Sequence, residues 1–142
     1  MFKNIVVPLD LLDKPSVDIV LQKSVDLARA FESTLSFIYV IPDFGMKAVE
    51  DYLPKHWIRD QKDKHNTQII ELIKRYIPSE IKVNINIARG SVYDQIIQYS
   101  NDIQADLIVV SAIRPQLRDY MLGPNASKIV RHSLISVLVI RE

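Results

Sequence analysis

The first candidate for ligand chemistry is a carboxylate that follows an apolar run. Asp10 comes shortly after Ile5–Val7 and Pro8. A carboxylate at the end of a strand can hold Mg²⁺ or a ligand hydroxyl group. Aspartate also commonly caps the turn before a helix, so a binding role and a turn-capping role both stay open.

The apolar run at residues 105–110 is followed by basic residues and then by the start of a helix. Arg114 and Arg118 lie in the loop after this run, and guanidinium groups recognise phosphate well. A loop arginine can equally remain solvated. Gly123 then opens a predicted helix at 124–132, and the free N–H groups and positive dipole end of a helix start suit an anion.

The sequence offers few residue patterns for metal binding or nucleophilic catalysis. His56 and His65 stand nine positions apart, which is not the spacing of a helical metal pair. The absence of cysteine excludes disulfides, thiolate nucleophiles, thiolate zinc sites and iron–sulfur clusters. No G-x-S-x-G nucleophile elbow occurs. The sequence therefore predicts a protein that is not an enzyme.

Composition narrows the ligand classes further. Three glycines occur in 142 residues, against about ten at average usage, and neither a Walker nor a Rossmann phosphate loop is present. A net charge of +1 argues against nucleic acid as the main partner. No apolar stretch approaches the ~18 residues of a membrane helix, and the N-terminal residues do not resemble a signal peptide. We expect a cytoplasmic protein.

Short apolar runs alternate with amphipathic stretches along the chain. We predict strands at 5–7, 35–41, 81–88, 105–110 and 134–140, and helices at 16–31, in the later part of 47–76, at 92–100 and at 124–132. Such alternation predicts one α/β domain, residues 1–142, with a parallel sheet and helices on both faces. Ligands bind such sheets beyond the carboxyl ends of the strands, where strand order reverses. If the first strand lies beside the fourth, the crevice is bounded by Pro8, Leu9, Asp10, Ser111 and Ala112.

Two strands are expected at the edges of the sheet. Residues 81–88 alternate between apolar and polar side chains, as a half-exposed strand does. The last strand is apolar on both faces apart from Ser136, and an exposed apolar edge is an aggregation hazard. We therefore expect a second subunit to cover it in a two-fold symmetric homodimer. The residues predicted at that interface are Val137, Leu138, Val139 and Ile140.

Three segments resemble the universal stress protein family: Ile5–Asp10, Ala105–Ser111, and Leu122–His132 running on to Val137–Arg141. The likeness covers essentially the whole chain in length and element order. The stretch 111–123 resembles one branch that carries Ser-His-Arg-Pro and then Tyr-Leu-Leu-Gly-Ser-Asn. The resemblance implies a five-stranded parallel sheet in the order 3-2-1-4-5, usually dimerised through the fifth strand. Many members bind ATP through a G-2x-G-9x-G-[ST] pattern, and others do not bind it.

The resemblance also implies a nucleotide site at the strand ends and the last helix. Its predicted residues are Pro8, Leu9, Asp10, Val40, Ser111, Ala112, Arg114, Gly123, Pro124, Asn125 and Ala126. Asp10 corresponds to the acidic residue that the family places near ribose, phosphate or Mg²⁺. Val40 corresponds to a position whose main chain contacts adenine, although a plain core valine is the alternative. Arg114 lies in the loop expected over the phosphates.

The chain departs from the family pattern at three places. Residues 111–115 contain neither early glycine, and Ile113 replaces the histidine of the branch. Pro124 replaces the family's Ser or Thr and supplies neither a hydroxyl nor an N–H group. The first expectation is a dimeric ATP- or AMP-binding sensor or regulator of the stress response. A second is a member that binds no nucleotide and acts only through protein partners, and a third is weak ATP hydrolysis.

One further cluster has no assigned role in these expectations. Trp57, with Tyr52, Leu53 and Ile58, forms an apolar group inside the polar segment 43–66. Such long segments are often the functional part of a domain. A dock for the partner subunit, a lid over the crevice and a local satellite core all stay open.

Overall fold

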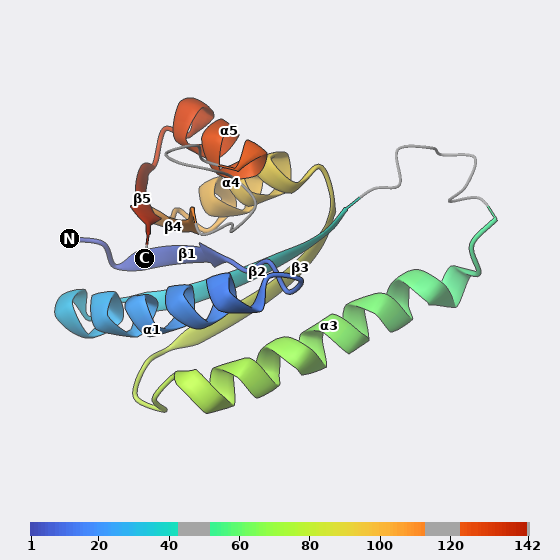
Figure 1. Ribbon diagram of the computed structural model, residues 1–142, viewed down its shortest axis with the longest axis horizontal. Coiled ribbons are helices and arrows are strands. Elements are labelled where there is room, and N and C mark those ends of the chain that lie inside the picture. Colours follow the sequence, from blue (N-terminus) through green and yellow to red (C-terminus); the bar gives the residue numbers. More distant parts are fainter. Residues whose placement is uncertain (43–51, 113–122, 142) are drawn as a thin grey trace.

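The computed structural model describes residues 1–42, 52–112 and 123–141. The strands are β1 (Asn4–Pro8), β2 (Thr34–Pro42), β3 (Val83–Gly90), β4 (Leu107–Ser111) and β5 (Ser136–Ile140). The helices are α1 (Lys14–Phe31), α3 (Lys55–Tyr76), α4 (Val92–Asp102) and α5 (Pro124–His132). The strands form a parallel sheet in the order β3-β2-β1-β4-β5 (Figure 1). The predicted fold class and strand order are confirmed.

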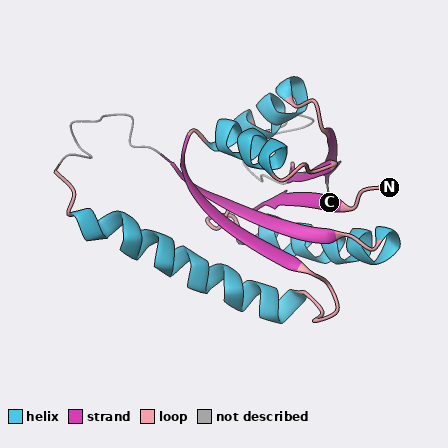
Figure 2. Cartoon of the chain, turned by 180° about the vertical axis from the view of Figure 1, so that it is seen from behind, coloured by secondary structure: helices cyan, strands magenta, loops and turns pink. Residues whose placement is uncertain are grey.

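Helices cover both faces of the sheet, with α1 and α3 on one face and α4 and α5 on the other (Figures 1 and 2). Successive residues of a central strand therefore point into two separate cores. In β1, Ile5 and Val7 join the core under α1 and α3, whereas Val6 joins the core under α4 and α5. All three side chains are fully buried, which explains why this run is continuously apolar.

The start of α1 is fixed at the carboxyl end of β1. The Asp13 side chain accepts a hydrogen bond from the Ser16 N–H at 3.4 Å and so caps the helix. One face of the helix is then buried against the sheet, through Ser16, Val17, Val20, Leu21, Ser24, Val25 and Ala28. This packing holds the first turn of α1 beside the predicted crevice.

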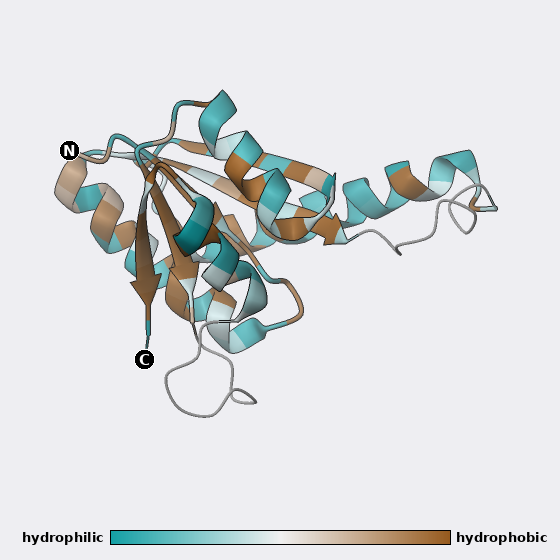
Figure 3. Ribbon diagram, turned by 90° about the horizontal axis from the view of Figure 1, so that it is seen from above, coloured by the Kyte–Doolittle hydropathy of each residue, from teal (hydrophilic) through white to brown (hydrophobic). Residues whose placement is uncertain are grey.

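α3 is the longest helix, and only part of its length is anchored. It has 22 residues, begins directly after Pro54 and buries Ile69 completely. Leu72, Ile73 and Tyr76 pack against the same core. The N-terminal half of the helix extends past the sheet in two views (Figures 1 and 3). The helix starts earlier than the periodicity of the sequence indicated.

The apolar cluster around Trp57 falls partly within this helix. Trp57 and Ile58 are half-buried in its first turn, and Leu53 is half-buried just before it. Tyr52 is 89% exposed. The remainder of the predicted segment, residues 43–51, lies outside the described residues.

β3 and β5 form the two edges of the sheet, as predicted. β3 ends at Gly90, whose φ of +136° is a conformation that side-chain-bearing residues rarely adopt. In β5, Leu138 is 38% exposed, and Leu134 just before the strand is fully exposed. Figure 3 shows β5 as an apolar strand at the margin of the molecule. The homodimer through β5 stays a prediction.

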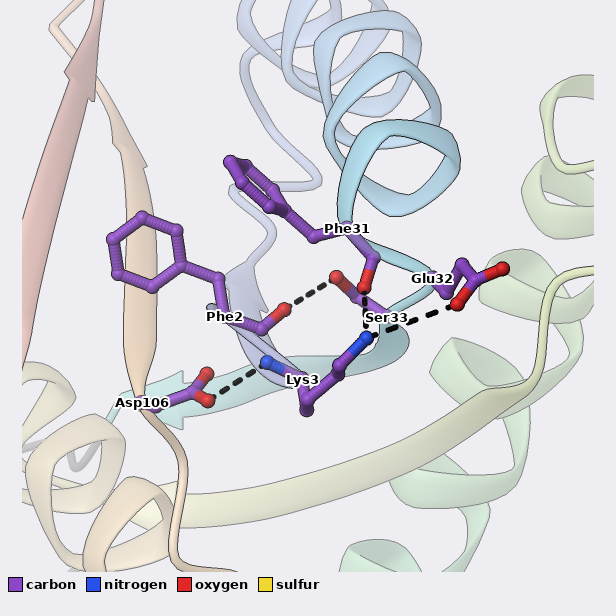
Figure 4. Close-up of polar contacts among 6 residues, drawn as sticks. All are labelled: Phe2, Lys3, Phe31, Glu32, Ser33 and Asp106. Atoms are coloured by element: carbon purple, nitrogen blue, oxygen red, sulfur yellow. Dashed lines mark hydrogen bonds and ion pairs between the residues drawn. The ribbon is translucent and has the colours of Figure 1, made fainter.

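A polar network fixes the amino end of the sheet, away from the crevice (Figure 4). The Asp106 carboxylate accepts hydrogen bonds from the backbone N–H groups of Lys3 at 2.7 Å and Asn4 at 3.0 Å. The Lys3 ammonium donates to the Phe31 carbonyl at 2.7 Å and lies 3.9 Å from Glu32. The network ties the start of β1 to the end of α1 and the start of β4.

Candidate functional site

A cavity of about 280 Å³ opens at the carboxyl ends of β1, β2 and β4. β1 is the central strand, with β2 on one side and β4 on the other. The strand order reverses at this point, which is where open α/β sheets bind ligands. The described residues that line the cavity are Pro8, Leu9, Asp10, Leu12, Asp13, Ser16, Ile38, Tyr39, Val40, Pro42, Val92, Ile96, Val110, Ser111, Gly123, Asn125, Ala126 and Ile129.

The cavity brings together most of the residues predicted for the site. Eight of them line it: Pro8, Leu9, Asp10, Val40, Ser111, Gly123, Asn125 and Ala126. Ala112 follows β4 and Pro124 begins α5, but neither is among the described lining residues. Arg114, Arg118 and Ile113 lie outside the described residues.

The structure shows the turn-capping role of Asp10, and it also places this residue at the cavity. Its carboxylate accepts the Leu12 N–H at 3.2 Å, and its carbonyl accepts the Asp13 N–H at 3.0 Å. Asp10 therefore does cap the turn between β1 and α1. The same residue lines the cavity, so the turn holds its carboxylate at the edge of the cavity.

The first turn of α1 also lines the cavity, and the sequence analysis did not include it. Leu12, Asp13 and Ser16 are all lining residues. A signal was available, because an aspartate three positions before a serine at the start of an amphipathic run predicts a helix N-cap. That helix follows β1 directly, so its first turn had to lie at the carboxyl end of the sheet.

Tyr39 is a second lining residue that the sequence analysis missed. It lies in β2 next to Val40 and is 8% exposed. Burial, together with the negative charge of Asp10, raises the pKa of the Tyr39 phenol above its usual value. Tyr39 thus brings a neutral phenol within the electrostatic influence of Asp10, and such a phenol can serve as a hydrogen-bond donor.

The start of α5 forms the wall opposite α1. Gly123 is the N-cap with φ −57° and ψ 160°, and no described side chain caps the helix. The first backbone hydrogen bond of the helix runs from the Ser127 N–H to the Gly123 carbonyl at 2.9 Å. Asn125 and Ala126, which precede Ser127, both line the cavity. A helix start of this kind favours an anion.

Two of the described lining residues carry a charged side chain, and both are acidic. Asp10 and Asp13 are carboxylates, and the described lining contains no Lys or Arg. Such a wall suits ligand hydroxyl groups, which can donate to carboxylates. No group of three or more His, Cys, Asp or Glu residues that could hold a metal occurs among the described residues. The Mg²⁺ predicted at Asp10 would therefore need further oxygen ligands from the bound molecule.

A model of the universal stress protein family matches residues 1–141. The chain belongs to this family. Universal stress protein G of Salmonella typhimurium is 24% identical over 145 residues, covering 99% of this chain and all of that protein. Of the stretch 111–123, which resembles the Ser-His-Arg-Pro branch, residues 113–122 lie outside the described ranges.

Solved structures of universal stress proteins share this fold. The universal stress protein UspA from Lactobacillus plantarum superposes with a TM-score of 0.79 at 23% identity, over 99% of this chain and 98% of that one. The universal stress protein from Archaeoglobus fulgidus in complex with dAMP has a TM-score of 0.68 at 15% identity, over 99% of this chain and 98% of that one.

Within the described part of the chain, no helix is long and apolar enough to cross a membrane.

Proposed function

We propose that this universal stress protein binds an adenine nucleotide in the cavity and acts as a nucleotide-dependent regulator of a stress response rather than as an enzyme. The observation that carries the proposal is the convergence of eight predicted residues, from distant stretches of the chain, on one cavity at the strand-order reversal. The dAMP complex of the Archaeoglobus fulgidus relative supports the choice of ligand class.

The chemistry of the walls matches the parts of a nucleotide. Apolar side chains of Ile38, Val40, Val92 and Ile96 offer a surface for the base. Asp10 offers a carboxylate for ribose hydroxyl groups. The cavity volume of about 280 Å³ is just below the usual range of ligand pockets, roughly 300–1,000 Å³. It therefore suits the nucleoside part, with the phosphates outside it.

Phosphate groups would meet opposing influences at this site. The start of α5, with Asn125 and Ala126, favours an anion. The carboxylates of Asp10 and Asp13 repel it. Mg²⁺ is held in proteins by one or two carboxylates together with substrate phosphates, and Asp10 is the residue that would contribute here. Nucleoside triphosphate should therefore bind more tightly with Mg²⁺ than without it.

A second function follows from Pro124. This residue begins α5 where the family carries Ser or Thr, and it has neither hydroxyl nor N–H. The loss favours the alternative that the chain binds no nucleotide and acts only through protein partners. The two functions differ in one measurable property, which is the affinity for the nucleotide.

The deciding experiment measures nucleotide binding directly. Purified protein is denatured in acid, and released ligand is identified by ultraviolet absorbance and mass spectrometry. Calorimetric titration of stripped protein with AMP, with MgATP and with ATP plus EDTA then gives the affinities. We expect binding of AMP and MgATP, weaker binding of metal-free ATP, and weakened MgATP binding in Asp10→Asn. No released nucleotide and no titration signal would favour the second function.

We also propose that the chain forms a homodimer through β5. The strand is at the edge of the sheet, and the exposed apolar residues Leu134 and Leu138 lie just before it and in it. Pairing two copies of β5 would cover this edge and give a closed, two-fold symmetric assembly.

A further inference from the structure

Tyr39 connects the cavity to α3. It lines the cavity, and its ring centroid lies 4.6 Å from that of His65, with 50° between the ring planes. Neighbouring side chains of a strand point to opposite faces, so Ile38 and Val40 join the core under α4 and α5 while Tyr39 joins the core on the α3 side. Tyr39 is therefore both a lining residue of the cavity and a residue whose ring contacts α3.

His65 stands where α3 leaves the sheet. C-terminal to it, Ile69 is fully buried in the core. N-terminal to it, residues 55–64 contribute nothing to either of the described cores, and this half of the helix extends past the sheet (Figures 1 and 3). The His65–Tyr39 contact is thus a support for the extending half.

The contact is one of packing. The Nδ1 atom of His65 is buried and has no hydrogen-bond partner in the described structure. No hydrogen bond through this nitrogen fixes the imidazole, so packing contributes to the position of the ring. Tyr39 supplies a ring that it packs against, and Tyr39 is also a lining residue of the cavity.

We propose that the Tyr39–His65 contact couples occupancy of the cavity to the order of residues 55–65 of α3. This inference rests on the proposed nucleotide binding. An occupied cavity restricts the Tyr39 ring, which then presents a fixed surface to His65, and the extending half of α3 opens less often. Coupling through motion of this kind needs no change in the average fold. Linkage requires the converse, so weakening the contact lowers nucleotide affinity by up to the same factor.

The extending half of α3 would then present a ligand-dependent surface. It carries Trp57 and Ile58 together with several charged side chains, including Arg59 and Lys62. A regulator needs a surface whose order differs between the ligand-free and ligand-bound states. This half of the helix supplies one on the same chain, at a distance from the nucleotide.

The test is hydrogen–deuterium exchange of the full chain with and without saturating AMP. We expect AMP to slow amide exchange in residues 55–65 by about fivefold, the lower end of typical coupling between sites. His65→Ala removes the ring, so the slowing should disappear and the affinity for AMP should fall by up to the same factor. His65→Phe keeps an aromatic ring without the buried nitrogen and should retain the slowing.

The matched control is His56→Ala, which changes an exposed histidine of the same helix. It should bind AMP and slow exchange as the wild type does. If AMP binds the wild type but leaves exchange of residues 55–65 unchanged, the coupling is overturned and the proposed function stands. Retention of the slowing in a folded His65→Ala variant also overturns the coupling. If no nucleotide binds the wild type, the proposed function and the coupling fail together.

Discussion

Pro124 is the residue at which the chain departs most clearly from a good phosphate site. It occupies the first position of α5, directly after Gly123. Proline suits this position because its fixed φ is already helical. It donates no hydrogen bond, however, and Gly123 has no side chain to donate one. The helix start is left with the N–H groups of Asn125 and Ala126 as its nearest donors.

Two substitutions separate the missing donors. Pro124→Ala restores the N–H group, and Pro124→Ser restores the N–H and a hydroxyl. A hydrogen bond to a charged group contributes about 1.5–3 kcal/mol, so each donor that reaches phosphate should raise the affinity by roughly tenfold or more. Calorimetric titration with MgATP should therefore rank the variants as Ser above Ala above wild type.

The control for these variants is Pro78→Ala, which changes the proline between the end of α3 and β3. It should leave the affinity for MgATP unchanged, because Pro78 is not a lining residue of the cavity. Equal affinities for wild type, Pro124→Ala and Pro124→Ser would contradict a phosphate position at the start of α5.

At the residue scale, the sequence indicates positions better than it indicates roles. The strand pattern identified four lining residues, Pro8, Leu9, Asp10 and Ser111, because the carboxyl ends of parallel strands share one edge of the sheet. The resemblance to the family added Val40, Gly123, Asn125 and Ala126. The sequence alone could not decide between a binding role and a turn-capping role for Asp10, since one side chain can both cap a turn and face a cavity. Tyr39 was missed because an apolar run shows that a strand is buried but not which of its residues reach the cavity.

At the scale of elements, α3 depends on a short anchor. Ile69 is the buried residue of this helix, with Leu72, Ile73 and Tyr76 packed partly around it. Strands such as β1 were predictable because burial on both faces requires a continuous apolar run. The N-terminal half of α3 was not, because a helix that extends past the sheet has no buried face to impose a period of 3.6 residues.

The anchor is tested by two neighbouring isoleucines of α3. Ile69→Ala should lower the free energy of unfolding by about 2–5 kcal/mol, since it leaves a cavity in a packed core. Ile70 is 36% exposed, and Ile70→Ala should change the free energy of unfolding by less than about 0.5 kcal/mol. Urea denaturation followed by circular dichroism measures both. Equal effects of the two substitutions would mean that α3 is not anchored through Ile69.

At the scale of the whole molecule, alternating strands and helices were enough to predict the sheet and both covering layers. The crevice was predicted on the condition that the first strand lies beside the fourth, and the structure has β1 between β2 and β4, where strand order reverses. The same connectivity places the first turn of α1 at this end of the sheet, because the helix follows β1 directly. Which of its side chains line the cavity depends on how the helix lies across the sheet, and periodicity reports only which face of a helix is buried.

The edge of the sheet at β5 is the surface through which we predict a homodimer. Leu138 of β5 is 38% exposed, and among the described strands β4 is the one neighbour of β5. In a two-fold dimer through β5, each copy of Leu138 would lie near its symmetry mate. Leu138→Lys would bring two positive charges into a contact that excludes water. Burying unpaired charge is costly, so the dissociation constant should rise by at least about tenfold.

Light scattering coupled to size-exclusion chromatography measures this equilibrium at micromolar concentration. The wild type should elute as a dimer and Leu138→Lys as a monomer. Ile70→Lys is the matched control, because Ile70 is 36% exposed but lies on α3 rather than at the sheet edge, and it should remain dimeric. A monomeric wild type would refute the dimer. Two dimeric lysine variants would place the interface on a surface other than β5, because a charge at the edge strand would then have no effect on association.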